Sequence, residues 1–407
     1  MIKSSPLLIF YVLIIQITYG QNDTIISFLE KEVSNSIKKD AIELYSANLS
    51  NGSNDFKELQ KKLTGVKIVG LGEVTHGSSE IFKMKHRFIR FLVENLDFNI
   101  FSIEGNMPEA YDINRYIRNS EETAKSVIGG MGFWTWYTYE LKDLVEWFKN
   151  YRFENGEKVL FTGFDMQSPK GPVKELKKVL KGNALDTLFY LGRSIDSVKS
   201  NSRKGLNLLD FYSGKIDFLR NWIKINLEEG NEKSWALQNI RILEQITHNE
   251  DYRLRDYYMA ENVAWIYKEN PKSKIVLWAH NEHVKNSNKS MGYHLKEKYG
   301  DSYISIGFCF YEGEYTAAGN GGIKVYKAQK AYDGTYESVF NKIQVPYFIL
   351  DLGDKEYLPK SLLFRKTGAI KFENEFAKTH LSKDYDYIVF IQKSSASELM
   401  NKERRTN

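Results

Sequence analysis

The chain has 407 residues, of which 42% are hydrophobic, and this is enough for one large domain or two smaller ones. Its formal charge is only +5 at pH 7, without a long basic block, and this argues against a nucleic-acid-binding protein. The single cysteine, Cys309, excludes an internal disulfide and a cysteine-based metal site. We predict that it is a buried, small hydrophobic residue in a strand.

The first 20 residues have the layout of a secretory signal peptide. Lys3 precedes the apolar run 7–15, and the small residue Gly20 precedes the expected cleavage point at Gln21. The run is shorter than the ~20 residues that a membrane-spanning helix needs. We therefore expect residues 21–407 to form an exported bacterial protein, periplasmic or secreted, without stable membrane association after cleavage. An uncleaved N-terminal anchor is the alternative.

A strand, a glycine-rich turn and a helix follow one another near the start of the mature chain. The apolar run 66–71 predicts a buried strand, the turn after it contains Glu73 and His76, and apolar residues at helical spacing predict a helix over 80–96. In the alternative interpretation, the glycines only form a tight turn and His76 is incidental. Further strands are predicted at the runs listed here: 97–104, 158–165, 273–280, 302–311, 346–351 and 385–391.

This pattern predicts an α/β fold with a central, mostly parallel sheet flanked by helices, because a strand–helix–strand unit gives parallel strands. The stretch of about 171–270 has helical patterns and few strand signals. Since the strand pattern resumes after it, we expect a helical insertion that forms a cap over the sheet, within one domain of residues 21–407.

Several predicted strands end in ionisable side chains. Glu104 ends the second strand, Asp165 ends the third, and His280 and His283 end and follow the fourth. Because the ends of parallel strands meet at one edge of a sheet, where ligands bind, we expect these residues to lie near Glu73 and His76.

The sequence lacks three common catalytic motifs: the Gly-x-Ser-x-Gly elbow, the P-loop and His-Glu-x-x-His. His280 and His283 are three residues apart and would share one face of a helical turn, where they could bind a metal or a substrate group. A neutral imidazole oriented by a carboxylate can also activate water without a metal. The residues alone leave both possibilities open.

An ordered set of short motifs is similar to one known family. The motifs are Gly72-Glu-Val-Thr-His-Gly77, Lys85-His-Arg87, Ser102-Ile-Glu-Gly105, Gly163-Phe-Asp-Met166, Arg255-Asp-Tyr-Tyr-Met-Ala-Glu-Asn262 and Trp278-Ala-His-Asn-Glu-His-Val284. Together they resemble the erythromycin esterase family, from about Ser50 to the C-terminus.

The resemblance implies a hydrolase, independent of metals and cofactors, that opens the macrolactone ring of erythromycin-like antibiotics and so gives macrolide resistance. It implies that His76 activates water and that Glu73 and Glu104 orient the water or the base. The implied role of His280 and His283 is to polarise the ester carbonyl or hold the substrate. A basic side chain is also expected in the site, either Lys85 or Arg87.

A large macrolide needs a wide, mostly apolar cleft. Phe133, Trp134 and Trp136, in a glycine- and aromatic-rich segment over 129–139, are candidates for its wall, and packing in the core is the alternative. The first N–H groups of the helix near Ser79 could stabilise an oxyanion.

Two other functions stay open: a hydrolase of another ester or amide, and a metal-binding protein of the same fold.

Overall fold

The computed structural model describes residues 32–119, 121–156, 159–200, 208–248, 252–353 and 355–400. The predicted signal peptide lies outside these residues. None of the helices in the described ranges is both long enough and apolar enough to cross a membrane.

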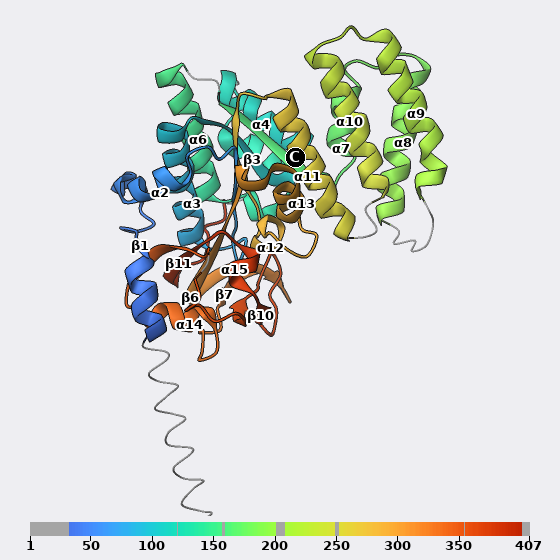
Figure 1. The fold of residues 1–407 in the computed structure, drawn as a ribbon. Helices are drawn as coiled ribbons and strands as arrows, with labels where there is room; N and C mark the ends of the chain where they lie inside the picture. Colours follow the sequence, from blue (N-terminus) through green and yellow to red (C-terminus); the bar gives the residue numbers. More distant parts are fainter. Residues whose placement is uncertain are drawn as a thin grey trace, which may run out of the picture.

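A mixed, mostly parallel sheet of nine strands forms the centre of the molecule (Figure 1). Its order is β1-β8-β11-β6-β2-β5-β3-β4, with β7 paired to the far end of β6. The five pairs from β11 to β4 are parallel, whereas β8, β1 and β7 each pair antiparallel. The strands are β1 (Ile42–Glu43), β2 (Ile68–Leu71), β3 (Phe98–Asn106), β4 (Leu160–Asp165), β5 (Lys274–Trp278), β6 (Tyr303–Gly319), β7 (Gly322–Lys327), β8 (Tyr347–Asp351) and β11 (Tyr387–Ser394), and β9 (Leu362–Arg365) pairs separately with β10 (Phe376–Thr379).

Helices follow most strands of the parallel part. They are α2 (Lys57–Lys62), α3 (Ser79–Leu96), α4 (Met107–Asn119), α5 (Ala124–Gly130), α6 (Tyr139–Asn155), α7 (Lys170–Leu176), α8 (Asn183–Ser200), α9 (Leu208–Asn226), α10 (Asn231–Thr247), α11 (Tyr252–Glu269), α12 (Asn281–Val284), α13 (Met291–Tyr299), α14 (Tyr336–Asn341) and α15 (Leu381–Asp384), with short 3-10 turns at Leu49–Asn51, Asn54–Phe56, Trp134–Trp136 and Gly300–Ser302. Residues 32–40 are also helical.

The α/β class and the mostly parallel sheet are as predicted, and a strand lies in each of the seven predicted runs. Four short strands lie outside the predicted runs: β1, β7, β9 and β10. The prediction for β6 ended at residue 311, because the polar residues Glu312 and Glu314 interrupt its apolar run. The strand continues to Gly319 because β7 pairs with its second half around a turn at Gly321 and Gly322, both with positive φ.

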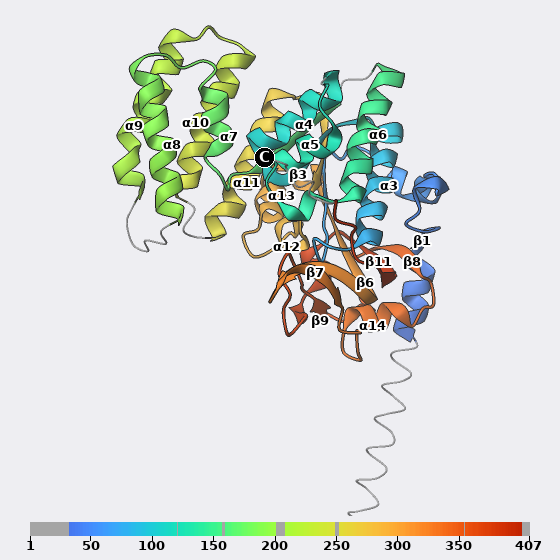
Figure 2. The same ribbon diagram turned by 180° about the vertical axis from the view of Figure 1, so that it is seen from behind.

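The central strands are buried on both faces, as expected for a parallel sheet covered by helices. Alternate residues of β2 and β5 supply opposite faces: Val69, Leu71 and Trp278 pack with α3 and α6, whereas Ile68 and Leu277 pack with α11 and α13. Figures 1 and 2 show α3 and α6 on one side of the sheet and α11 and α13 on the other.

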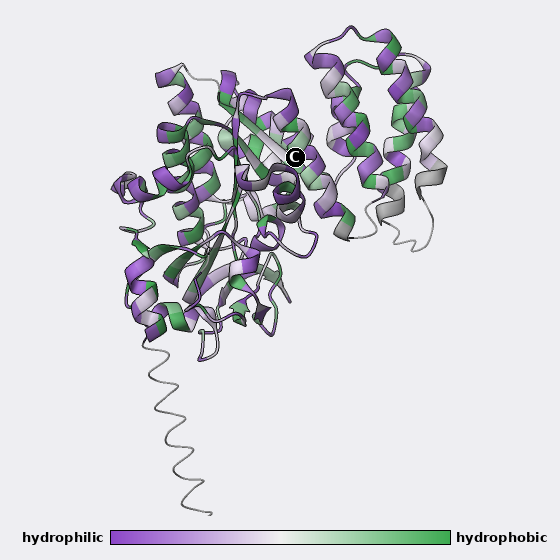
Figure 3. Cartoon of the chain, viewed as in Figure 1, coloured by the Kyte–Doolittle hydropathy of each residue, from purple (hydrophilic) through white to green (hydrophobic). Residues whose placement is uncertain are grey.

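The regular elements in the described residues of the insertion between β4 and β5 are all helices. Its helices α7–α10 pack on one another and lie beyond α11, beside the α/β body (Figure 1). Apolar residues of these helices, such as Leu188, Leu219 and Ile240, continue the core of the α11 side of the sheet. Figure 3 shows hydrophobic residues on the packed sides of these helices and hydrophilic residues on much of the outside. That this insertion forms a cap over the sheet stays a prediction.

The turn after β2 passes so close to β6 that Gly77 has no room for a side chain. Its carbonyl accepts hydrogen bonds from the backbone N–H groups of Thr316 and Ser397, at 2.9 and 2.7 Å. A Cβ atom at Gly77 would lie 1.9 Å from the carbonyl oxygen of Thr316. We expect Gly77→Ala to lower the free energy of unfolding by about 1–3 kcal/mol or more, because backbone must move to admit the methyl group.

Urea denaturation of the purified variant measures this loss. The matched control is Gly130→Ala, since a Cβ atom there meets nothing within 4 Å. The control should unfold at the wild-type urea concentration or slightly above it. Equal stability of the two variants would contradict the tight contact between the turn and β6.

Candidate functional site

The turn between β2 and α3 is fixed to the end of β5. Gly72 lies against the Asn281 side chain, so closely that a Cβ atom would be 2.2 Å from its Oδ1 atom. The Asn281 backbone N–H donates to the carbonyl of Glu73 at 2.8 Å, and its side-chain amide bonds Phe308 of β6. Ser78 caps α3 by accepting the N–H of Ile81. These contacts place the side chains of the turn at the edge of the sheet where β2 and β5 end.

Glu73 orients His76. The Nδ1 atom of His76 lies 2.7 Å from Oε1 of Glu73. A carboxylate can only accept, so Nδ1–H donates to Glu73 and the neutral ring keeps its lone pair on Nε2. Within the described part of the chain, no hydrogen-bond partner of Nε2 is found, and His76 keeps 9% of its surface exposed. The ring can therefore accept a proton from a molecule that enters the site.

Lys85 and Trp278 hold Glu73 from the other side. The Lys85 ammonium group and the Trp278 indole N–H donate to Oε2 of Glu73 at 2.8 and 2.6 Å. Both Lys85 and Glu73 have no exposed surface. Burial lowers the pKa of Lys85 to about 8, although Glu73 opposes this shift. The carboxylate thus has each oxygen engaged and can hold the imidazole in one orientation.

His280 lies beside His76 but has both ring nitrogens engaged. Its Nδ1 accepts the N–H of Glu282 at 3.2 Å, and its Nε2 therefore carries the hydrogen and donates to the carbonyl of Val74 at 3.2 Å. Burial lowers the pKa of His280 to about 4. The rings of His76 and His280 have their centroids 5.3 Å apart. His280 is thus a neutral side chain that packs against His76 and fixes the turn.

His283, in contrast to the neutral His280, faces two carboxylates. Its Nδ1 lies 2.9 Å from Asp256 and its Nε2 lies 3.3 Å from Glu104. Burial alone lowers the pKa of His283, but the two carboxylates outweigh it and raise the pKa to about 10. His283 is therefore a cation at neutral pH.

Glu104 connects these groups. It accepts the backbone N–H of His280 at 2.8 Å and the Arg255 guanidinium at 3.0 Å, and Arg255 also pairs with Asp165 at 2.7 Å. Burial alone raises the pKa of Glu104, but His283 and Arg255 hold it well below its usual value. A network of fixed charged side chains thus lies beside His280.

The structure brings together six ionisable residues that the sequence pattern placed at one edge: Glu73, His76, Glu104, Asp165, His280 and His283. Lys85 also lies in this cluster. Trp136 contacts it too, with its ring 5.6 Å from that of His76 and its N–H on the carbonyl of Glu104 at 2.8 Å.

Three other candidates lie differently. Arg87 is buried on the far side of α3, where its guanidinium pairs with Asp55 at 2.7 Å and bonds the carbonyls of Ser46 and Gly52. It was predicted as a possible basic group of the site, and the structure corrects this because its donors are used between α3 and the chain before α2. Phe133 packs partly buried against the core, and Trp134 is half-buried.

The expected oxyanion donors at the start of α3 are largely engaged inside the protein. The N–H of Ser79 donates to the carbonyl of Ser395 at 2.9 Å, and that of Ile81 donates to the Ser78 hydroxyl. These two groups are not available to a substrate.

Metal binding by the His280–His283 pair gains no support from the geometry. The nitrogens of both rings are directed at other protein groups, as described above. In the described ranges, no group of three His, Cys, Asp or Glu side chains is arranged to hold a metal ion.

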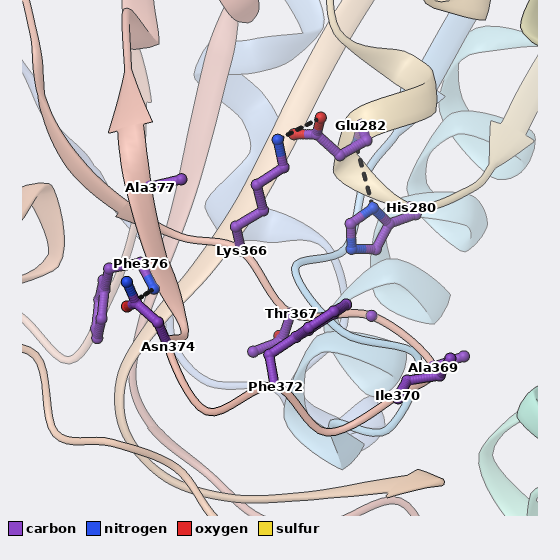
Figure 4. A pocket seen from close by; sticks show the side chains of 11 residues that line it. His280, Glu282, Lys366, Thr367, Ala369, Ile370, Phe372, Asn374, Phe376 and Ala377 are labelled. Atoms are coloured by element: carbon purple, nitrogen blue, oxygen red, sulfur yellow. Dashed lines mark hydrogen bonds and ion pairs between the residues drawn. The ribbon is translucent and has the colours of Figure 1, made fainter. Parts of the chain in front are cut away.

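Sequence reasoning missed one wall of the site. A cavity of about 500 Å³ opens beside His280 and Glu282, and the segment 366–377 forms its other side (Figure 4). Most of this segment links two strands that the sequence did not predict, and it has no periodic pattern that could have revealed it. The direct bond of Trp278 to Glu73 was also missed, although Trp278 stands at the end of a predicted strand.

Comparison with known proteins now identifies the family. The family model described as erythromycin esterase matches residues 93–394. This chain belongs to the erythromycin esterase family. The type II erythromycin esterase of Escherichia coli is 28% identical over 85% of this chain and 94% of its own length.

Solved structures share the fold of this chain. A Bacillus cereus protein is 25% identical, with a TM-score of 0.81 over 91% of this chain and 99% of its own. The erythromycin esterase EreC, solved as a mutant in its open conformation, has the same fold, with a TM-score of 0.68 at 20% identity over 86% of this chain and 96% of its own. Membership of the family supports hydrolase activity.

The charge of His283 gives a pH prediction. Its pKa is about 10 in the folded protein and about 6.5 in the unfolded chain, so its contribution to stability is complete below pH 6.5 and is lost as the pH rises towards 10. We expect His283→Gln to be less stable than wild type at pH 6.5, because Glu104 and Asp256 lose their buried cation. The difference should shrink by about 1.4 kcal/mol per pH unit between pH 7 and 9.

Urea denaturation of both proteins at several pH values measures this difference. The opposite trend expected from Lys85, whose pKa is lowered, is present in both proteins and cancels. The control is His380→Gln, an exposed histidine far from this network in sequence. A difference between His283→Gln and wild type that does not change with pH would show that His283 is not a cation.

Proposed function

We propose that this protein is a carboxylic ester hydrolase that opens the macrolactone ring of erythromycin-like antibiotics, with His76 as the base that activates water. The observation that carries this proposal is the Glu73–His76 pair, in which Nδ1–H is bound at 2.7 Å and Nε2 is left to accept a proton. The chemistry needs a base in one fixed tautomer, and this pair provides it.

The reaction proceeds in two steps. Nε2 of His76 takes one proton from water while the water oxygen bonds to the ester carbonyl carbon, and this gives a tetrahedral oxyanion and an imidazolium stabilised by Glu73. The oxyanion then re-forms the carbonyl, the bond to the ring alkoxide breaks, and His76 returns its proton to that alkoxide. The products are a carboxylic acid and an alcohol on one opened chain, and the enzyme is restored.

The charged network beside the site acts by positioning groups, because its charges balance. The cations of His283 and Arg255 are paired with three carboxylates, Glu104 among them. Glu104 in turn accepts the backbone N–H of His280 at 2.8 Å. We propose that His283 acts indirectly, by holding Glu104 and thereby the segment that carries His280.

The macrolide as substrate is supported by the relative named erythromycin esterase type II and by the size of the cavity beside His280, about 500 Å³. A different ester or amide substrate is the second candidate. The observation that favours it is the 28% identity to that relative, since so distant a likeness does not carry substrate choice. The signal-peptide pattern supports a proposed exported location, where the enzyme would act on a small molecule outside the cytoplasm and so give macrolide resistance.

We expect His76→Asn to lose about 10²–10⁴-fold in kcat while the fold persists, because proton transfer by a placed side chain typically supplies this factor. Ester hydrolysis and circular dichroism measure the two effects. The matched control, His380→Asn, changes an exposed histidine and should keep the wild-type rate. Full activity of His76→Asn would exclude His76 as the base.

The substrate is tested by incubating the purified mature protein with a panel of macrolides. Mass spectrometry should show a gain of one water on erythromycin with wild type and none with His76→Asn. Hydrolysis of simple esters without any change in the macrolides would favour the second candidate. Activity that is lost on chelation and restored by a metal would instead favour a metal-dependent protein.

A further inference from the structure

The cavity beside His280 has walls of two kinds. On one side, Lys366 and Glu282 form an ion pair of 2.9 Å. On the other side, the segment 367–377 presents apolar side chains, among them Ile370 and Phe372. In Figure 4 the ion pair lies above His280, whereas Ile370 and Phe372 lie below it. The cavity therefore suits a ligand with a polar side and an extended apolar side.

The apolar wall is tied directly to the catalytic turn. The Thr367 hydroxyl donates to the carbonyl of Val74 at 2.6 Å, and the Thr75 hydroxyl donates to the carbonyl of Gly368 at 3.2 Å. The same carbonyl of Val74 also accepts from His280. Because Val74 and Thr75 directly precede His76, the wall and the base keep a fixed separation.

A buried carboxylate anchors the segment that forms the apolar wall. Glu375 has no exposed surface and accepts from the Arg365 guanidinium, the Lys371 ammonium group and the Tyr315 hydroxyl. The backbone of the wall also joins the sheet, since Ala318 of β6 bonds both Ala369 and Lys371 at 2.8 Å. These bonds fix the segment to the sheet.

The exposure of the apolar tips follows from this support. Ile370 keeps 58% of its surface exposed and Phe372 keeps 48%, although each stands on a segment fixed at several points. A single exposed apolar residue needs no explanation. Two of them on one wall of a cavity that reaches a histidine next to the base indicate a binding surface.

We infer that Ile370 and Phe372 determine specificity by binding the apolar, non-reacting part of a bulky ester whose carbonyl lies near Nε2 of His76. This inference rests on the proposed hydrolase function and adds to it the substrate class: esters with a large apolar acyl part are preferred over small acyl esters. The Lys366–Glu282 pair faces the polar groups of the same molecule.

Two p-nitrophenyl esters test this selectivity, because decanoate and acetate share the leaving group and differ only in the apolar acyl chain. We expect Ile370→Ser and Phe372→Ser each to raise the ratio of KM for the decanoate to KM for the acetate about 10-fold. The matched control is Phe153→Ser, which changes a phenylalanine that is 89% exposed at the end of α6. The control should hydrolyse both esters as wild type does.

Binding without turnover separates this inference from the proposed function. Calorimetric titration of erythromycin into His76→Asn should show binding, and adding Phe372→Ser should weaken it about 10-fold. Unchanged KM for the decanoate, an equal loss for both esters, or no binding of erythromycin by His76→Asn would each overturn the inference. Full turnover by His76→Asn would overturn the proposed base and leave the apolar wall in place.

Discussion

The buried carboxylate of Glu73 is the group on which the site depends. One oxygen orients His76, and the other accepts from Lys85 and Trp278, so both oxygens are engaged and the carboxylate is held in one orientation. An isolated buried carboxylate is costly, and the ion pair with Lys85 makes its burial tolerable. The cost is also seen in Lys85, because burial lowers its pKa to about 8. This arrangement keeps the tautomer of His76 fixed before any substrate arrives.

Three histidines at one edge of the sheet have three different roles because their partners differ. His76 faces a carboxylate on one nitrogen only and can act as a base. His280 faces a backbone N–H and a carbonyl, and its pKa is lowered to about 4. His283 faces two carboxylates, and its pKa is raised to about 10. Residue type alone therefore does not define the chemistry, since hydrogen-bond partners and burial select the protonation state.

The α/β class and the strand ends were readable because each parallel strand is a short apolar run buried on both faces and is followed at once by polar residues. That pattern placed Glu104, Asp165 and His280 at a common edge, and the structure places them there. Arg87, predicted as a possible basic group of the site, lies elsewhere because of the geometry of α3. Arg87 is two positions after Lys85 on α3, so the two side chains leave the helix on different faces, and Arg87 meets Asp55 instead.

The sequence by itself determined the fold class, the polar residues at which the strands end, and the family. These features depend on local periodicity and on motifs of adjacent residues. Only the tertiary structure decided which histidine keeps a ring nitrogen free, which one faces two carboxylates and which wall shapes the cavity. These properties depend on contacts between residues far apart in the chain, such as Thr367 with Val74 and Arg255 with Glu104. No periodic pattern encodes such contacts, because they arise only when distant segments are brought together in the fold.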